Sequence, residues 1–371
     1  MIIGAGPAGL AAAACLRERG LPYRVLERGD RVGRSWREHY DRLHLHTIRT
    51  LSHLPGLPLP GGYPRYVARA QVVDYLEAYA ERFGIEPTFG VEVVHVERTA
   101  REGGPWRIEA SDGRSFEARH VIVATGLNRV PVAPSWPGQD ETTIPISHSR
   151  DYRNGANFAG RSVLVVGMGN TGAEIALDLC EHGARAAISV RGPVNIVMRD
   201  TLGRPVQQTA MLLARLPTRL ADPIGRLLQR LSVGDLSRWG LERPAIAPGA
   251  QLRTTGQTPT IDVGTVARIR RGEIEVLPGV ERFEREAVCF TDGRRRTFDQ
   301  VVLCTGYRPE LTEIVPASAS MLDARGYARD VIGRGEAAGL YLLGFDPYSP
   351  GGLLNGIARD APRVAEAIAE G

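Results

Sequence analysis

Two glycine-rich motifs, each followed at a similar spacing by a charged side chain, are the residues of this chain best suited to chemistry. The first motif covers residues 4–9, and Glu27 follows its last glycine by eighteen residues. The second covers residues 167–172, and Arg191 follows its last glycine by nineteen residues. A carboxylate after the second strand of such a unit accepts hydrogen bonds from an adenosine ribose, whereas a guanidinium there meets the 2′-phosphate of NADP. The spacing therefore predicts FAD on the first motif and NADPH on the second.

Each glycine of these motifs has an expected physical task. The first permits a tight turn, the second lets backbone N–H groups approach a pyrophosphate, and the third allows close packing of the following helix. The helix N-terminus then faces the phosphate charge. The residues that we predict to contact the two cofactors are Gly4, Gly6, Pro7, Ala8, Gly9, Glu27, Arg28, Arg34, Ser35, Trp36, Gly126, Gly167, Gly169, Asn170, Thr171, Gly172, Arg191, Thr305 and Gly306.

Single pieces of this pattern also have simpler explanations. One glycine motif by itself is compatible with an ordinary turn between a strand and a helix. Residues 33–36, Gly-Arg-Ser-Trp, either lie beside the flavin or form a surface turn with a packed tryptophan. Arg191 either binds a phosphate or is a solvated arginine at a strand end. Two motifs in the same register, each with a suitable charge after it, favour the nucleotide interpretation.

The composition excludes several other kinds of chemistry. All 46 basic side chains are arginine, because the chain contains no lysine. Schiff-base and pyridoxal phosphate chemistry, and a phosphate-binding loop that needs a lysine, are therefore excluded. The net charge of +4 suits phosphate-bearing cofactors, but the arginines are dispersed and aromatic residues are few. We therefore predict no nucleic-acid binding.

The positions of cysteine and histidine argue against two further kinds of site. The four cysteines, at positions 15, 180, 289 and 304, are far apart and form no CxxC pair. Disulfide reduction of the thioredoxin-reductase type is therefore disfavoured. His44, His46 and His53 have no acidic or cysteine partners at ligand spacing, so we expect packing or surface histidines and no metal.

An internal repeat indicates the domain organisation. Residues 112–114, Asp-Gly-Arg, lead through an apolar run to Ala-Thr-Gly at 124–126, and residues 292–294 lead in the same way to Cys-Thr-Gly at 304–306. Each Asp-Gly pair reads as a hairpin turn, and each apolar run as a buried parallel strand ending near a cofactor. We predict an α/β fold of two Rossmann-like dinucleotide-binding domains. An NADPH domain, residues 154–282, is inserted into a discontinuous FAD domain, residues 1–153 and 283–371.

The apolar periodicity predicts the elements that must hold these motifs. Helices are expected at residues 11–19, 70–83 and 171–181, and strands at 23–26 and 162–166. Only three residues precede Gly4, so the first strand is shorter than such a motif normally needs and upstream residues are suspected to be missing.

The leucine-rich stretch 211–233 is a separate question, because it alternates leucine with arginine as membrane-surface helices do. Proline at 217 and 223 interrupts it, so we expect these leucines to be buried against the rest of the protein instead. With neither a signal peptide nor a long uncharged apolar run, the chain is predicted to be cytoplasmic without stable membrane attachment. No oligomeric state is predicted.

The chain resembles the flavin-containing monooxygenases, which are class B flavoprotein monooxygenases, and most closely the YUCCA-type enzymes and their bacterial relatives. The matching stretches are residues 4–9, 33–36, 43–46, 63–66, 124–126, 167–172, 199–203, 258–264, 305–307, 339–341 and 344–345. His148, Tyr152 and Arg153 match the second half of the family signature. In its first half, Thr142 and Ile144 stand where the family has phenylalanine and glycine.

This resemblance implies a monooxygenase whose substrates are a small molecule and dioxygen. NADPH would reduce FAD, and the reduced flavin would capture O2 as a C4a-peroxide. The expected reaction is oxidative decarboxylation of an aromatic 2-oxo acid such as indole-3-pyruvate, with N- or S-oxygenation as the alternative. Asn170 is the candidate catalytic residue, through polar contact with NADP or the peroxide. An NADPH-dependent flavin reductase or oxidase, and a non-catalytic nucleotide-binding regulator, remain open.

Overall fold

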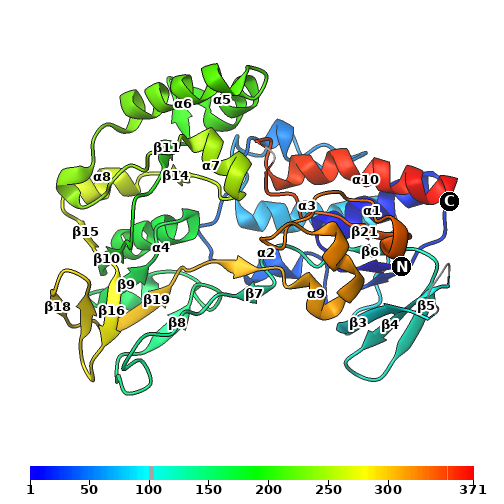
Figure 1. Cartoon of the computed structure of the whole chain (residues 1–371), viewed down its shortest axis with the longest axis horizontal. Helices are drawn as coiled ribbons and strands as arrows, with labels where there is room; N and C mark the ends of the chain where they lie inside the picture. The colour runs from blue at the N-terminus through cyan, green and yellow to red at the C-terminus, as the bar shows by residue number, and fades with distance from the viewer. Residues whose placement is uncertain (100–103, 349) are drawn as a thin grey trace. The chain divides into compact units, whose positions relative to one another are not determined.

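Short apolar strands that end at glycine turns form the centres of two separate units. The computed structural model describes residues 1–99, 104–348 and 350–371, and Figure 1 colours the chain from blue to red. The first unit contains Met1–Glu38, Thr47–Val130 and Tyr307–Gly371. The second unit contains His39–His46 and Pro131–Gly306. The second unit is thus inserted into a discontinuous first unit.

The first unit is built on a parallel sheet with the strand order β2-β1-β6-β21. Its strands are Val25–Leu26, Ile2–Ile3, Val121–Val123 and Leu340–Leu342, in that order. All of these residues are buried, as expected for parallel strands that are covered on both faces. Helix α1 (Pro7–Glu18) packs against α10 (Leu353–Glu370), as Figure 1 shows.

The other elements of the first unit are short, apart from one helix and one sheet. The antiparallel sheet consists of β3 (Val93–Arg98), β4 (Trp106–Ala110) and β5 (Ser115–Ala118). The helices and 3-10 turns are α2 (Arg34–Glu38), η1 (Arg49–Leu51), α3 (Arg69–Arg82), α9 (Leu311–Ile314), η4 (Pro316–Met321) and η5 (Gly335–Ala337). Strands β7 (Val130–Pro131) and β20 (Tyr307–Arg308) form a two-stranded pair.

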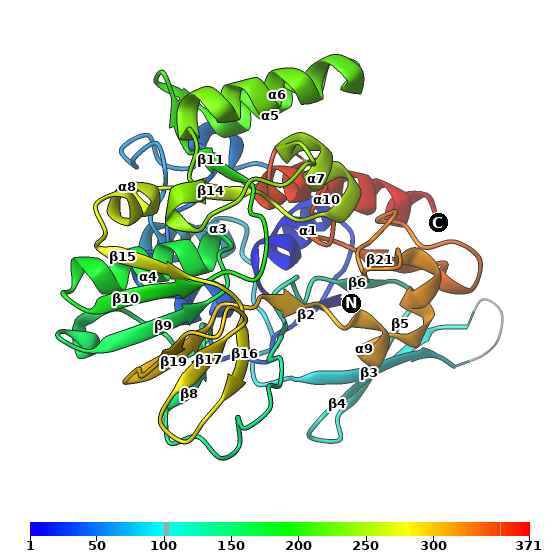
Figure 2. The ribbon, with the colours of Figure 1, turned by 60° about the vertical axis from the view of Figure 1, so that its left-hand side comes forward.

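The second unit has a parallel sheet with the strand order β15-β10-β9-β19-β8, seen side by side in Figure 2. Its strands are Ile274–Leu277, Arg185–Ser189, Ser162–Val166, Gln300–Leu303 and Ile146–His148, in that order. The helices and 3-10 turns are η2 (Ala156–Phe158), α4 (Asn170–Glu181), α5 (Val206–Leu213), α6 (Thr218–Val233), η3 (Ser237–Trp239), α7 (Pro248–Thr255) and α8 (Thr265–Arg270). The smaller strands are β11 (Ile196–Met198), β12 (Asp200–Thr201), β13 (Arg204–Pro205), β14 (Thr260–Asp262), β16 (Val280–Phe283), β17 (Val288–Phe290) and β18 (Arg295–Arg296).

The predicted internal repeat is visible in the backbone of the two units. Gly4 has φ +106° and Gly167 has φ +105°, and each is followed by a helix of 12 residues. Asp112 and Asp292 each accept a hydrogen bond of 3.0 Å from the backbone N–H two residues later. Both units therefore repeat one turn, one helix and one hairpin. The prediction of an α/β fold with two Rossmann-like units is confirmed.

The elements agree closely with the predicted ones, but the borders of the units differ from the predicted domain borders. Strand β9 has the predicted bounds, and helices α1, α3 and α4 each begin one to four residues before the predicted start. The second unit extends to residues 131 and 306, beyond the predicted 154–282. The reason is strand pairing, because β8 and β19 both belong to the sheet that contains β9.

The expected burial of the leucine-rich stretch is wrong for five of its leucines. The side chains of Leu212, Leu216, Leu220, Leu227 and Leu231 are exposed. A periodic apolar pattern predicts one apolar helix face, but it does not say what covers that face. Among the described residues, no helix is both long and apolar enough to cross a membrane.

Candidate cofactor sites

The first glycine turn is tied to Glu27 by hydrogen bonds at the carboxyl edge of the parallel sheet. Gly4 donates its N–H to Leu26 O at 2.8 Å, so the turn and the end of β2 lie side by side. The buried carboxylate of Glu27 accepts the N–H of Ala5 at 2.7 Å and that of Gly29 at 2.8 Å. Each carboxylate oxygen can accept a further hydrogen bond, which a ribose hydroxyl would donate.

Other predicted FAD contacts lie on the segment after Glu27, where several already have protein partners. Arg28 is exposed and its guanidinium lies 3.8 Å from Glu92. Arg34 donates to Glu38 at 2.6 Å, and this hydrogen bond raises the pKa of the guanidinium. Ser35 and Trp36 lie with Arg34 on α2. These contacts fix α2 in position, and a direct contact of its side chains with the flavin stays a prediction.

Four of the six motif glycines form two pairs that differ in what a Cβ atom placed on them would meet. At Gly9 and Gly172, the third glycines, a Cβ would overlap the carbonyl oxygen of the first glycine in the same turn. Packing inside the chain therefore requires these two glycines. At the middle glycines, Gly6 and Gly169, a Cβ would meet no described heavy atom within 4 Å.

The backbone conformation does not require the middle glycines either. Gly6 has φ −83° and Gly169 has φ −84°, values that any residue adopts. Each is the N-cap residue of a 12-residue helix whose N-terminal N–H groups point into this space. Neither packing nor backbone conformation therefore explains why these two residues are glycine. A ligand in close contact with the backbone would explain it, because such a ligand leaves no room for a side chain. Both turns therefore fit a pyrophosphate.

The strand ends that face these turns show the same open space, and one of them carries an unpaired hydroxyl. Gly126 and Gly306 have φ +84° and +89°, and a Cβ on either would meet no described heavy atom within 4 Å. The buried hydroxyl of Thr125 has no hydrogen-bond partner among the described residues. Its counterpart Thr305 donates to Val132 O. Thr125 is not among the site residues predicted from the sequence, although its place before Gly126 in the repeated Thr-Gly pair is a usable signal.

In the second unit, the side chains of Asn170 and His148 hydrogen-bond to backbone groups of other segments. The Asn170 side-chain oxygen accepts the N–H of Ile261 at 2.6 Å. Its NH2 group therefore remains to donate a hydrogen bond to a ligand. His148 Nδ1 accepts the N–H of Arg150 at 3.2 Å, and the imidazole also bonds to the backbone of Gly306. Burial lowers the pKa of His148, which keeps the ring neutral at pH 7. The catalytic role of Asn170 stays a prediction.

Arg191, the predicted partner of a 2′-phosphate, lies at the same edge of the sheet as the second glycine turn. Gly167 donates its N–H to Ser189 O at 3.0 Å, and Arg191 follows Ser189 by two residues at the same edge of the sheet. Its side chain is exposed and makes no hydrogen bond or ion pair with any residue that the structure describes. The guanidinium is therefore available to an incoming phosphate dianion.

The segment His39–His46 belongs to the second unit and contacts the nucleotide turn, which the sequence did not predict. Tyr40 is buried and hydrogen-bonds to Thr171, and its pKa is well above the usual value because of burial. Arg42 donates to Glu181 at 2.9 and 3.1 Å. His46 Nε2 lies 2.8 Å from the buried Glu174 Oε1, an ion-pair contact without hydrogen-bond alignment. The segment thus contacts helix α4 near both ends of the helix, at Thr171 and at Glu181.

Replacing Glu174 by alanine should cost more stability than the same change at Glu181. Loss of Glu174 leaves the buried ring nitrogens of His46 without their carboxylate partner, so we expect the free energy of unfolding to fall by about 1–3 kcal/mol. Loss of the exposed Glu181 should cost less than about 1 kcal/mol. Urea unfolding followed by circular dichroism measures both. Equal losses of unfolding free energy in the two variants would show that the buried contact of Glu174 stabilises the protein no more than the exposed contact of Glu181.

Comparison with known proteins decides the family. Residues 1–203 match the family described as pyridine nucleotide-disulphide oxidoreductase. The chain is 40% identical to indole-3-pyruvate monooxygenase YUCCA1 of Oryza sativa subsp. japonica, over 99% of this chain and 90% of that protein. It is 37% identical to indole-3-pyruvate monooxygenase YUCCA6 of Arabidopsis thaliana, over 99% and 89%. The chain belongs to the YUCCA family of flavin monooxygenases. It is an NADPH-dependent monooxygenase that uses FAD.

Solved structures agree on the fold of this YUCCA-family enzyme. A flavin-containing monooxygenase from Stenotrophomonas maltophilia has a TM-score of 0.74 at 24% identity, covering 100% of this chain and 97% of that one. An oxidized steroid monooxygenase bound to NADP has a TM-score of 0.79 at 18% identity, covering 99% and 84%. A bacillithiol disulfide reductase from Bacillus cereus is also similar, with a TM-score of 0.69 at 21% identity, covering 100% and 98%.

The cysteines of the YUCCA-family enzyme are poorly suited to the chemistry of a disulfide reductase. All four are free, and Cys15, Cys289 and Cys304 are buried. Burial raises the pKa of Cys15 to about 11 and also raises that of Cys304, so both stay protonated at neutral pH. Among the described residues, no group of three or more His, Cys, Asp or Glu side chains is placed to hold a metal ion.

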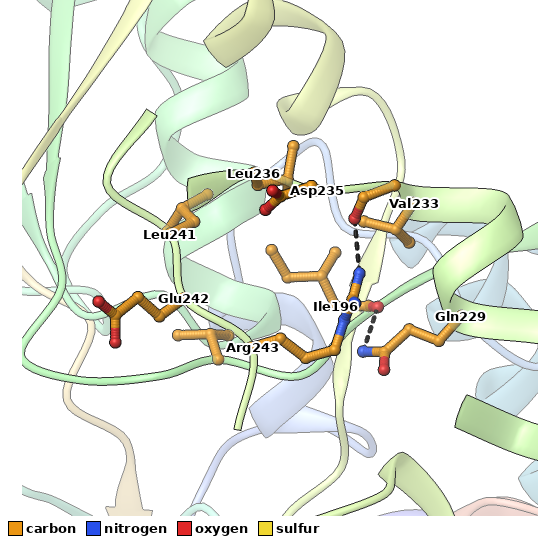
Figure 3. Close-up of a pocket in the computed structure, with 10 residues that line it drawn as sticks. Ile196, Gln229, Val233, Asp235, Leu236, Leu241, Glu242 and Arg243 are labelled. Carbon is orange, nitrogen blue, oxygen red and sulfur yellow. Dashed lines mark hydrogen bonds between the residues drawn. The ribbon is translucent and has the colours of Figure 1, made fainter. Parts of the chain in front are cut away.

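A small hollow in the second unit lies apart from the glycine turns. Figure 3 shows it beside Ile196, Gln229 and Arg243. Gln229 donates to Ile196 O at 2.9 Å, and Arg243 donates to Gly234 O at 2.5 Å, so these polar groups bond to the backbone around them. The carboxylate of Glu242 points away from the other polar groups in this view. We therefore do not assign a cofactor to this hollow.

Proposed function

We propose that this enzyme converts an aromatic 2-oxo acid, such as indole-3-pyruvate, into the acid that is one carbon shorter. The observation that carries the proposal is the identity of 36–40% to indole-3-pyruvate monooxygenases over at least 99% of this chain. The balanced reaction consumes the 2-oxo acid, O2, NADPH and a proton. It yields the shorter acid, CO2, NADP⁺ and water.

The proposed assignment places FAD on the first unit and NADPH on the second. Support comes from the open space at Gly6 and Gly169, and from the different charges of Glu27 and Arg191. Bound FAD supplies the redox chemistry, because it takes hydride from NADPH and reacts with dioxygen. The two glycine turns and their helix N-termini bind the pyrophosphates. Glu27 orients the ribose, and the Asn170 NH2 group is proposed to contact the nicotinamide nucleotide.

We also propose that the substrate is a small molecule and that the enzyme acts in the cytoplasm. A 2-oxo acid carries a negative charge, which suits a chain with a net charge of +4 and no lysine. The buried hydroxyl of Thr125, with no partner among the described residues, is proposed as a further donor to the flavin.

A product assay with labelled dioxygen tests this proposal. Purified enzyme, FAD, NADPH and ¹⁸O2 are incubated separately with indole-3-pyruvate, phenylpyruvate, an aliphatic 2-oxo acid, an amine and a thioether. We expect the aromatic 2-oxo acids to lose CO2 and gain one labelled oxygen atom, at one NADPH per product. Oxygen gain on the amine or thioether alone would assign N- or S-oxygenation instead. Hydrogen peroxide equal to the NADPH consumed with every compound would identify an oxidase.

A further inference from the structure

Helix α6 has an exposed apolar face that contains none of the predicted cofactor contacts. Its side chains Leu220, Ile224, Leu227 and Leu231 are 51%, 40%, 56% and 76% exposed. We call these four residues the leucine stripe. Their spacing of four, three and four residues places them on one side of the helix. Large apolar side chains gathered in this way on a surface indicate an interaction site.

The opposite side of α6 fixes the orientation of the stripe. Ala221, Gln229 and Val233 are buried, and Gln229 donates to Asn195 Oδ1 at 3.0 Å and to Ile196 O at 2.9 Å. Asp222 accepts two hydrogen bonds of 2.8 Å from Arg253 on α7. Both views show α6 at the border of the second unit, outside β11 and β14 (Figures 1 and 2). The stripe is therefore held outward by a well-packed helix.

The charges beside the stripe are positive. Between Val206 and Val233 the chain has four arginines and a single carboxylate, Asp222, which Arg253 already neutralises. Arg219 and Arg230 are exposed and make no ion pair with any residue that the structure describes. Helical spacing places both arginines along one border of the stripe. An apolar stripe bordered by arginine is the pattern of a helix that lies in the surface of a membrane containing anionic lipids.

Another exposed leucine lies on the hairpin that precedes α5. Leu202 is 103% exposed at the tip between β12 and β13, and its φ is +50°. A leucine in the left-handed region is strained, so this conformation is costly for a side chain that contacts only water. A hairpin tip that enters the interfacial region of a bilayer would give this leucine an apolar environment.

We propose that α6 binds the surface of an anionic lipid bilayer, with the leucine stripe in the interface and Arg219 and Arg230 on lipid phosphates. A symmetric contact between two copies is less suitable. It would bring the arginines of both chains to the same stripe without carboxylates to pair them. The binding is peripheral, and it is independent of the proposed substrate.

Vesicle flotation of the full-length, FAD-loaded enzyme tests the proposal. Vesicles of phosphatidylcholine alone are compared with vesicles that also contain phosphatidylglycerol, at low and high salt. We expect binding to the anionic vesicles, weakened by salt. The double variant Leu220→Gln, Leu227→Gln should bind at least roughly tenfold more weakly, because two leucines leave the interface. The variant Arg219→Gln, Arg230→Gln should lose the preference for anionic lipid.

A matched control and a second readout keep the test decisive. Leu353→Gln removes a leucine that is 37% exposed on α10, outside the stripe, and should bind vesicles like the wild type. Flavin absorbance and circular dichroism confirm that each variant is folded. Equal binding by all variants, or no binding to either vesicle, would overturn the proposal. A dimer in light scattering that the leucine variant dissociates, without vesicle binding, would assign the stripe to a second copy.

Discussion

Replacing Gly6 by valine should give a folded but colourless protein, and replacing Gly169 by valine should give a yellow protein that NADPH cannot reduce. Neither position needs glycine for its φ, and a Cβ at either would meet no described heavy atom within 4 Å. The added side chain therefore disturbs only the ligand that approaches the backbone. Losing two hydrogen bonds to a charged pyrophosphate weakens the affinity by on the order of 100-fold or more.

The third glycine of each motif is the control for this pair. Alanine at Gly9 or Gly172 would place its Cβ on the carbonyl oxygen of the turn itself. We expect these variants to lose about 3 kcal/mol or more of unfolding free energy. The valine variants at the middle glycines should lose less than about 1 kcal/mol as apoproteins. Flavin absorbance, anaerobic reduction and urea unfolding separate the two classes. A Gly6→Val protein that keeps its flavin would show that the pyrophosphate lies elsewhere.

The sequence predicted the glycine turns and the strands beside them well, because local residues determine their conformation. A glycine such as Gly4, with φ +106°, leaves a trace in the sequence, since few other residues tolerate that conformation. The buried strand β9 is a run of four apolar residues after Ser162, so its bounds could be read directly. The repeat of hairpin, strand and Thr-Gly end then placed Gly126 and Gly306 at the edges of their sheets.

Contacts between distant parts of the chain left no comparable trace. Tyr40 packs against a turn that is more than a hundred residues later, and nothing near Tyr40 in the sequence points to that partner. Glu174 reads as an ordinary polar residue of an amphipathic helix, yet it is buried beside His46. The strand β8 is too short and too polar at Ser147 to be recognised as the edge of a parallel sheet. These omissions explain why the predicted domain borders differ from those of the compact units.

The leucine stripe shows another reason why the sequence could not predict the whole structure. The period of the apolar residues on α6 was readable, and it predicted a helix with one apolar face. The interpretation of that face as buried assumed that the chain itself covers it. Exposure is a property of the packed molecule, so only the structure could show that Leu227 and Leu231 face outward.

Arg191→Ala should raise the KM for NADPH by roughly 10- to 100-fold while changing the KM for NADH by less than about twofold, because the guanidinium is proposed to bind only the 2′-phosphate. Arg191 has the place for this role, two residues beyond the Ser189 carbonyl that holds the turn at Gly167. Arg185→Ala is the matched control, since Arg185 is an exposed arginine at the opposite end of the same strand, β10. Arg191→Lys should retain part of the preference, because a lysine keeps the charge and loses the bidentate geometry. Steady-state kinetics with both dinucleotides measures the ratio directly. If alanine at 191 raised both KM values by the same factor, the arginine would contribute to general nucleotide binding, and the preference for the phosphorylated cofactor would have to come from another residue.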